Sequence, residues 1–131
     1  MAEQDNAGGS KCPKFSGLHQ DYRSFAFLYK NWARTQGTWA FYGANAPARP
    51  ANAAAGADAA AVAAVVAAQA QWERLNAKAF ADLLLAQADV SVAMSLQDYD
   101  EVEGAAANAR PAQPAQAWEY LRVTYVGLDT V

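Results

Sequence analysis

The stretch DYRSFAFLYKNWARTQG, at residues 21–37, decides the fold class of this chain. Its large apolar residues recur at intervals of three and four, which is the spacing of one face of an α-helix. Asp21 is placed to cap the first turn, and Gly37 can adopt the left-handed conformation that ends a helix. The stretch therefore predicts a helix from about Asp21 to Gln36. Its buried stripe is expected to contain Tyr22, Phe25, Leu28, Tyr29, Trp32 and Ala33.

The segments that follow favour further helices. Residues 38–42 are aromatic and lie between two glycines, so we expect a short helical turn packed under the first helix; a lone strand is the alternative. The alanine-rich run over 57–70 predicts one long helix that Asp58 caps and that reaches about Ala86. Its alanine face allows close approach of another helix, within the fold or between copies, and an exposed extension is the alternative. The packed residues are expected to be Trp72, Leu75, Ala79, Phe80, Leu83 and Leu84.

Two shorter helices complete the pattern. Asp89 is placed to cap a helix over 90–96, in which Val92, Met94 and Leu96 are available for packing. The last helix is expected to start near Pro114 or Ala115, because proline suits a first turn, and to end at Gly127. The chain is thus expected to be all-α, a compact bundle of about four to five helices with one long Ala-rich helix.

A length of 131 residues fits one domain. Alanine is too small to fill a core, so the packing must come mainly from the aromatic residues, which make up 11% of the chain. Residues 1–13 contain Gly8-Gly9-Ser10 and are expected to form a disordered tail, followed by a single helical domain over 14–131. Phe15 and Leu18 are expected to anchor the end of the tail.

The formal net charge of −3 is unevenly distributed. Residues 1–50 carry six Lys and Arg against three Asp and Glu, whereas residues 51–131 carry four against ten. Such polarity can favour head-to-tail association, and an ordinary solvated surface is the simpler interpretation. The single cysteine, Cys12, excludes an intrachain disulfide, and the polar start does not resemble a secretory signal. We expect a cytoplasmic protein that does not bind a membrane.

No residue pattern points to catalysis, a metal or a cofactor. The acidic loop over 98–103 lacks the spacing of a calcium-binding loop and is expected to be solvated. His19 is the only histidine, and a pair with Cys12 would lie near the tail with nothing to orient the ring. Nucleic-acid binding is expected only indirectly or through segments outside this chain. The candidate contacts to a polyanion are basic residues interleaved with aromatic residues of the expected core, namely Lys11, Lys14, Arg23, Lys30 and Arg34.

Three blocks of residues follow one another over residues 14–126: Lys14-Phe15-Ser16-Gly17 with Gly37 and Trp39, then Trp72 with Ala77-Lys78-Ala79, then Ala117-Trp118 with Leu121 and Tyr125. Read in order, these blocks resemble the Gag polyprotein of copia-type LTR retrotransposons. The family's opening K-F-x-G and later G-x-W are matched by Lys14, Phe15, Gly17, Gly37 and Trp39. Its tryptophan before an alanine-rich helix with leucines is matched by Trp72, Ala77, Lys78, Ala79, Leu83 and Leu84. Its A-W-x-x-L-x-x-x-Y block is matched by Ala117, Trp118, Leu121 and Tyr125. The alanine run departs from the family as an insertion, and one cysteine leaves no CCHC zinc knuckle.

The resemblance implies the N-terminal lobe of a Gag capsid, a helical bundle that packs into the hexamers and pentamers of a particle shell. We therefore expect a structural, self-associating domain without enzymatic activity that contributes to shell assembly around RNA. Its candidate interface is the exposed face of the first helix, with Arg23, Lys30 and Arg34. The alternative is a domesticated Gag-like adaptor for a peptide or protein partner, which an apolar groove between the first and last helices would favour. The expected core and motif residues are Phe15, Gly17, Trp32, Gly37, Trp39, Trp72, Leu83, Trp118, Leu121 and Tyr125.

Overall fold

The computed structural model describes residues 11–103 and 109–126. The protein is mostly helical, and this described part holds four α-helices and no strand, which confirms the all-α prediction. Three short 3-10 helices lie between or before them. The α-helices are α1 (Tyr22–Gln36), α2 (Ala59–Leu85), α3 (Val90–Ser95) and α4 (Pro114–Tyr125), and the 3-10 helices are η2 (His19–Asp21), η3 (Trp39–Tyr42) and η4 (Gln97–Tyr99).

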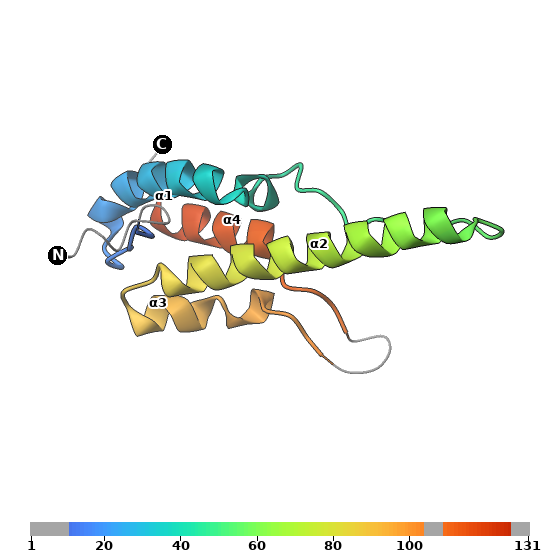
Figure 1. The fold of residues 1–131 in the computed structure, drawn as a ribbon. Coiled ribbons are helices and arrows are strands. Elements are labelled where there is room, and N and C mark those ends of the chain that lie inside the picture. The colour runs from blue at the N-terminus through green and yellow to red at the C-terminus, as the bar shows by residue number, and fades with distance from the viewer. Residues whose placement is uncertain (1–10, 104–108, 127–131) are drawn as a thin grey trace.

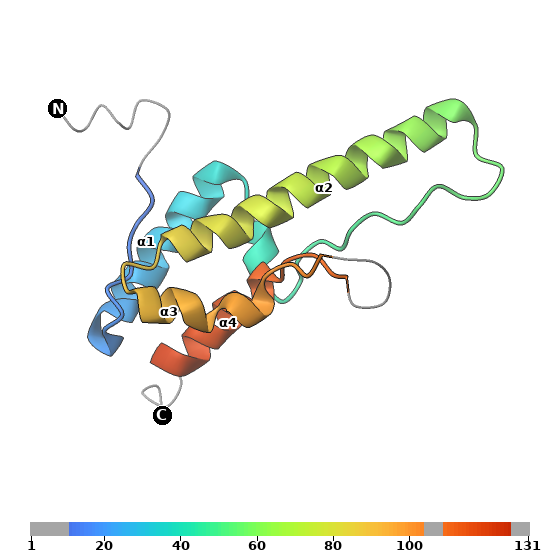
Figure 2. The same ribbon diagram turned by 90° about the horizontal axis from the view of Figure 1, so that it is seen from below.

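The helices pack around α4 and the C-terminal half of α2. Figure 1 shows α1 on one side of this pair and α3 with η4 on the other side. The short η3 contacts α1, α2 and α4 and so joins the three long helices. The N-terminal half of α2 projects beyond the other helices, and Figure 2 shows the segment before it running back along the same direction. The outer face of α1 and the region around η4 therefore lie on opposite sides of the molecule.

Local sequence signals account for most helix ends. The Asp58 carboxylate accepts a hydrogen bond from the Ala61 amide at 2.8 Å, and the Asp89 carboxylate accepts one from the Ser91 amide at 2.7 Å. Such caps satisfy amides that have no partner inside the helix. Gly37 ends α1 with φ of 77°, a conformation that costs glycine little. These predicted ends are confirmed.

The segment around Phe15 is fixed to the C-terminal end of α2. The Phe15 amide donates to the Ala86 carbonyl at 2.7 Å, and the Ala88 amide donates back to the Phe15 carbonyl at 2.9 Å. The Phe15 ring is fully buried and its centroid lies 4.9 Å from that of Tyr125. Gly17 follows with φ of 95°. The predicted anchor at Phe15 is present, because both its backbone and its ring are held.

The three sequence blocks meet in one aromatic cluster. Trp39, from the end of the first block, packs against Trp118 of the third with ring centroids 5.5 Å apart. Trp118 also stacks on Tyr29 of α1 at 5.5 Å. The Tyr29 and Tyr42 hydroxyls are 2.7 Å apart, and Tyr42 donates to the Ala79 carbonyl of α2 at 2.6 Å. The cluster thus connects α1, η3, α2 and α4.

The tryptophans lie at the border of the core rather than at its centre. Trp32, Trp39, Trp72 and Trp118 are partly buried and pack against the cluster, as does Tyr125. The centre is formed by smaller aromatic and aliphatic side chains. Those that are almost completely buried include Phe15, Tyr22, Tyr29, Leu83, Leu96 and Leu121.

Several details differ from the sequence-based expectations. Leu18, Leu28 and Met94, predicted to pack, are each more than half exposed. Asp21 does not cap α1, because it sits in η2 with helical backbone angles and its carboxylate accepts a hydrogen bond from the Ser16 hydroxyl at 2.7 Å. Cys12, assigned to the tail, is partly buried against the core. Asp98 belongs to η4 rather than to a loop, and the predicted helix end at Gly127 lies outside the described residues.

Candidate interaction surfaces

A stripe of three cations and one aromatic ring runs along the outer face of α1. Arg23, Phe27, Lys30 and Arg34 are spaced by four, three and four residues, which places them on one face. We call these four residues the basic stripe. Phe27 is 67% exposed. An apolar side chain that faces only water does not stabilise the fold, and exposed apolar surface beside polar residues is typical of an interaction site. The stripe therefore combines an apolar side chain with positive charge on both sides of it.

No carboxylate balances the charge of the basic stripe from within its own helix, since α1 contains no Asp or Glu. Among the ion pairs of the described residues, none involves Arg23 or Arg34. Lys30 is half-buried, and its Nζ lies 5.7 Å from the centroid of the Trp39 ring, where a cation–π attraction holds it. Arg23 and Arg34 are consequently available to an acidic partner.

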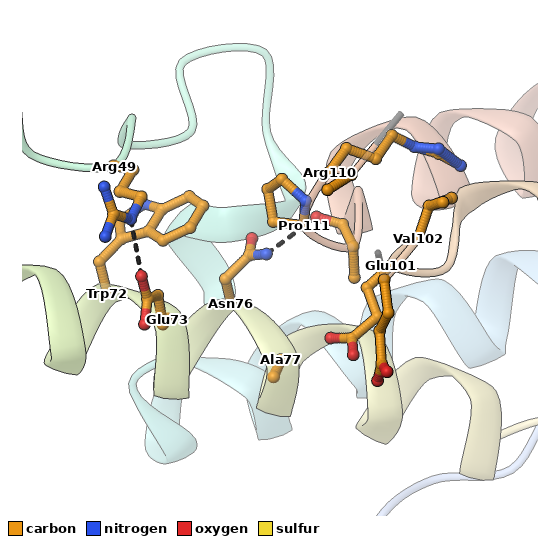
Figure 3. Close-up of a pocket in the computed structure, with 12 residues that line it drawn as sticks. Arg49, Trp72, Glu73, Asn76, Ala77, Glu101, Val102, Arg110 and Pro111 are labelled. Atoms are coloured by element: carbon orange, nitrogen blue, oxygen red, sulfur yellow. Dashed lines mark hydrogen bonds and ion pairs between the residues drawn. The ribbon is translucent and has the colours of Figure 1, made fainter. Parts of the chain in front are cut away.

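A second candidate surface is a groove of about 420 Å³ (Figure 3). One wall comes from α2 and the other from the segments around Glu101 and Arg110. Its lining is mainly apolar, with carboxylates at the rim, and we call it the acidic groove. The lining residues are Arg49, Trp72, Glu73, Asn76, Ala77, Glu101, Val102, Glu103, Ala109, Arg110, Pro111 and Ala112.

Hydrogen bonds between distant segments fix the walls of the acidic groove. The Asn76 side-chain amide is buried and donates to the Ala112 carbonyl at 2.8 Å. The Trp72 indole donates to the Pro47 carbonyl at 2.7 Å. Arg49 and Glu73 form an ion pair at 2.7 Å, so the charge of Glu73 is already compensated. These contacts hold the segments that line the groove to α2.

The uncompensated negative charge of the acidic groove is at Glu101 and Glu103. The Val102 and Arg110 backbones exchange two hydrogen bonds of 2.9 Å, which holds this segment extended. In extended backbone, residues two apart project to the same side, so the two carboxyl groups lie together. A hydrogen bond to Glu103 raises the pKa of Glu101 above its usual value, and the neighbouring negative charges of Glu103 and Asp100 act in the same direction. A cation placed between these carboxylates would relieve their repulsion.

A smaller depression of about 300 Å³ lies between α1 and α4. It is lined by Tyr22, Arg23, Trp118, Arg122 and residues beside them. Arg122 is held by two hydrogen bonds to Glu119, at 2.9 and 2.6 Å. The Tyr22 hydroxyl is buried and has no hydrogen-bond partner among the described residues, and burial raises its pKa. This depression lies where an adaptor was expected to have an apolar groove, between the first and last helices, but two arginines border it.

The structure separates the other residues that the sequence singled out for chemistry. The His19 ring packs against Tyr125 at 4.9 Å, whereas the Cys12 thiol donates to the neighbouring Pro13 carbonyl at 3.4 Å. Burial, with a smaller contribution from the Asp82 carboxylate, raises the pKa of Cys12 to about 11. Over residues 11–103 and 109–126, His, Cys, Asp and Glu side chains form no group of three or more able to hold a metal ion.

Phe27 and the acidic groove escaped the sequence analysis. Phe27 follows Arg23 by four residues and precedes Lys30 by three, so its spacing to the predicted interface residues was a usable signal. The acidic groove left no such signal, since it joins α2 to segments about 25 to 35 positions further along the chain. Of the predicted interface residues, Arg23 and Arg34 are exposed as expected, whereas Lys30 is only partly exposed because it packs over the Trp39 ring.

No family model, curated protein or solved structure matches this chain. In the part of the chain that the structure describes, no helix combines the length and the apolar character needed to cross a membrane.

Proposed function

We propose that this chain is a structural, self-associating domain of the Gag capsid type, which contributes through contacts between copies to a shell around RNA in the cytoplasm. The observation that carries the proposal is the basic stripe, where Phe27 is 67% exposed between cations that form no ion pair with any carboxylate of residues 11–103 and 109–126. Arginine is among the residues that most often dominate binding energy at protein interfaces, and phenylalanine is enriched in interface cores. The domain acts through its surfaces, and no catalytic step is assigned to it.

The arrangement of the motif residues supports the Gag part of the proposal. The three blocks that resemble Gag lie far apart in the sequence. The first and third meet through Phe15 and Tyr125 and through Trp39 and Trp118, and the second joins them through the Ala79 carbonyl, which accepts a hydrogen bond from Tyr42. Residues that set up a common core are expected to recur together in a family that shares the fold. Because the residues of the blocks pack inside the fold, we assign the function to the exposed surfaces, which differ in charge between the basic stripe and the acidic groove.

RNA enters the proposal as the content of the shell rather than as a direct ligand of this domain. The chain has a net charge of −3, and its candidate RNA contacts are limited to exposed cations near and on α1. Nucleic-acid affinity grows with the number of phosphates that a protein neutralises. A few cations supply little of it, so packaging is assigned to other segments of the assembly.

The test is the molar mass of the wild type and two variants by light scattering after size exclusion, from about 10 µM upward. Phe27→Ser is expected to remain a monomer where the wild type associates, because it removes the exposed ring. Leu85→Ser is the matched control, since Leu85 is also 67% exposed but lies at the end of α2. Equal association of all three proteins would contradict an interface at α1.

The depression between α1 and α4 favours one other function, an adaptor that binds a peptide. Trp118 lines it and would report binding through its fluorescence. Because Arg23 and Arg122 border the depression, the peptide to try first carries a carboxylate next to an apolar residue. If the wild type stays monomeric and its Trp118 fluorescence changes when such a peptide is added, the adaptor function is favoured over assembly.

A further inference from the structure

The basic stripe and the acidic groove lie on different sides of the molecule. Figure 1 shows α1 on one side of α2 and α4, with η4 and the segment that follows it on the other. The stripe of a copy therefore has no access to its own groove but can reach the groove of another copy. A contact between two different surfaces leaves one of each free at the ends of a dimer, so it can be repeated.

The two surfaces match in apolar shape. The apolar part of the lining of the acidic groove includes Trp72, Ala77 and Pro111, and we call it the floor. The volume of the groove, about 420 Å³, is within the range of ligand pockets. Phe27 is the one aromatic side chain of the basic stripe. An aromatic ring packs well against tryptophan and proline, and burying it removes apolar surface from water.

The two surfaces also match in charge. Glu101 and Glu103 lie side by side at the groove, and within the described residues neither forms an ion pair with a cation. Arg49 is paired with Glu73, whereas the Arg110 guanidinium donates to the Asp98 carbonyl, which does not neutralise its charge. With three Glu against two Arg, the lining of the groove keeps a net negative charge. On an α-helix, Arg23 and Arg34 lie roughly 6 and 10 Å along the axis from Phe27, on its two sides. One of them reaches the rim when the ring enters the groove.

We infer that the basic stripe of one copy docks in the acidic groove of the next, with Phe27 on the floor and an arginine between Glu101 and Glu103. This inference rests on the proposed self-association and names its two surfaces. Repetition of the contact gives a closed ring or an open chain of copies, according to the rotation between neighbours. Each contact is small and in part electrostatic, so it is weak alone and becomes weaker as salt increases.

The test uses one variant of each surface. Phe27→Glu places a carboxylate in the stripe and leaves the groove intact, while Ala77→Arg places a long cation on the groove floor and leaves the stripe intact. Both positions are exposed on helices, and both new residues favour helix, so folding is expected to be retained. Ala63→Arg is the control for the groove variant, because it makes the same charge change at an exposed position of α2 outside the groove.

Sedimentation velocity at equal concentrations is expected to show association of the wild type and Ala63→Arg. Phe27→Glu and Ala77→Arg are each expected to associate at least about tenfold more weakly, a loss of about 1.4 kcal/mol. Their equimolar mixture is expected to form a dimer and nothing larger. The intact stripe of Ala77→Arg can dock in the intact groove of Phe27→Glu, and the two surfaces that remain free are both altered. Circular dichroism checks that each variant is folded.

Two results would overturn the inference while leaving self-association standing. One is association of Ala77→Arg that equals that of the wild type. The other is a mixture that stays monomeric although each variant is monomeric and folded, because it would mean that stripe and groove do not meet. A wild type that remains a monomer throughout would instead contradict the proposed function, and the inference would fall with it.

Discussion

Replacing Tyr42 by phenylalanine is expected to destabilise the protein more than replacing Tyr29, although each change removes one hydroxyl oxygen. The Tyr42 hydroxyl has a single proton and donates it to the Ala79 carbonyl at 2.6 Å. The proton in the 2.7 Å contact between the two hydroxyls therefore comes from Tyr29. Burial raises the pKa of both phenols, so both stay protonated over the ordinary pH range.

The two substitutions leave different groups without partners. Tyr29→Phe removes a donor but keeps the bond from Tyr42 to Ala79, for an expected loss of about 1 kcal/mol. Tyr42→Phe removes that bond and also strands the Tyr29 hydroxyl, which is fully buried. Since a stranded buried donor costs about 1–3 kcal/mol, we expect a total of about 2–4 kcal/mol. The double variant strands no donor, so its loss is expected to be smaller than the sum of the two.

The assay is urea and thermal unfolding of the wild type, both single variants and the double variant, followed by circular dichroism. For a domain of this size, 1 kcal/mol corresponds to a change of about 4 °C in the melting temperature. The wild type, Tyr29→Phe and Tyr42→Phe should rank in that order of decreasing stability. Equal losses in the two single variants, or losses that add in the double variant, would refute the assignment of Tyr29 as the donor.

The remaining predictions concern a glycine, a cysteine and a tryptophan. Gly17→Ala is expected to cost about 2–4 kcal/mol, more than Gly37→Ala, because both have positive φ but only at Gly17 does an added Cβ meet another side chain, that of Asp89 at 3.1 Å. The Cys12 thiol, with a pKa of about 11, is expected to react with iodoacetamide at pH 8 roughly a hundredfold more slowly than in the unfolded chain, and faster as the pH rises toward 11. Trp118→Ala is expected to cost about 3 kcal/mol or more, because its ring neighbours include Tyr29 and Trp39.

Each of these predictions has a result that contradicts it. Equal melting temperatures for the two glycine variants would show that the contact with Asp89 carries no cost. Rapid native-state alkylation of Cys12 at pH 8 would mean that its thiol is solvated. The raised pKa of Cys12 also makes a contribution to stability that is complete below about pH 9 and is lost as the pH rises to about 11, because the unfolded chain loses this proton first. A Trp118→Ala variant as stable as the wild type would move that residue from the core to a binding surface.

Periodicity and local caps were enough to predict the helices. The spacing of Tyr22, Phe25 and Tyr29 identified α1, and Asp58 and Asp89 cap their helices as expected because capping needs only residues next to the helix start. At Asp21 the same reasoning was wrong. There the preceding turn gives helical backbone angles, and the Ser16 hydroxyl donates to the carboxylate.

The candidate surfaces were predictable only in part. The cations of α1 were selected because they fall off the core stripe, and the same criterion applies to Phe27. Leu28 was wrongly assigned to the core, since helical spacing alone does not show how wide the buried face is. The acidic groove depends on the pairing of Val102 with Arg110 and on the bond from Asn76 to Ala112. Contacts between such distant segments arise from tertiary packing and have no local pattern.

The most direct test of the account is sedimentation velocity of the wild-type protein from micromolar to near-millimolar concentration at two salt concentrations. We expect monomers at low concentration and growth to species of hexamer size or larger at high concentration, with less growth at the higher salt concentration. Many weak contacts then add to a stable shell. A strict monomer at every concentration and both salt levels would contradict self-association as the function of this domain.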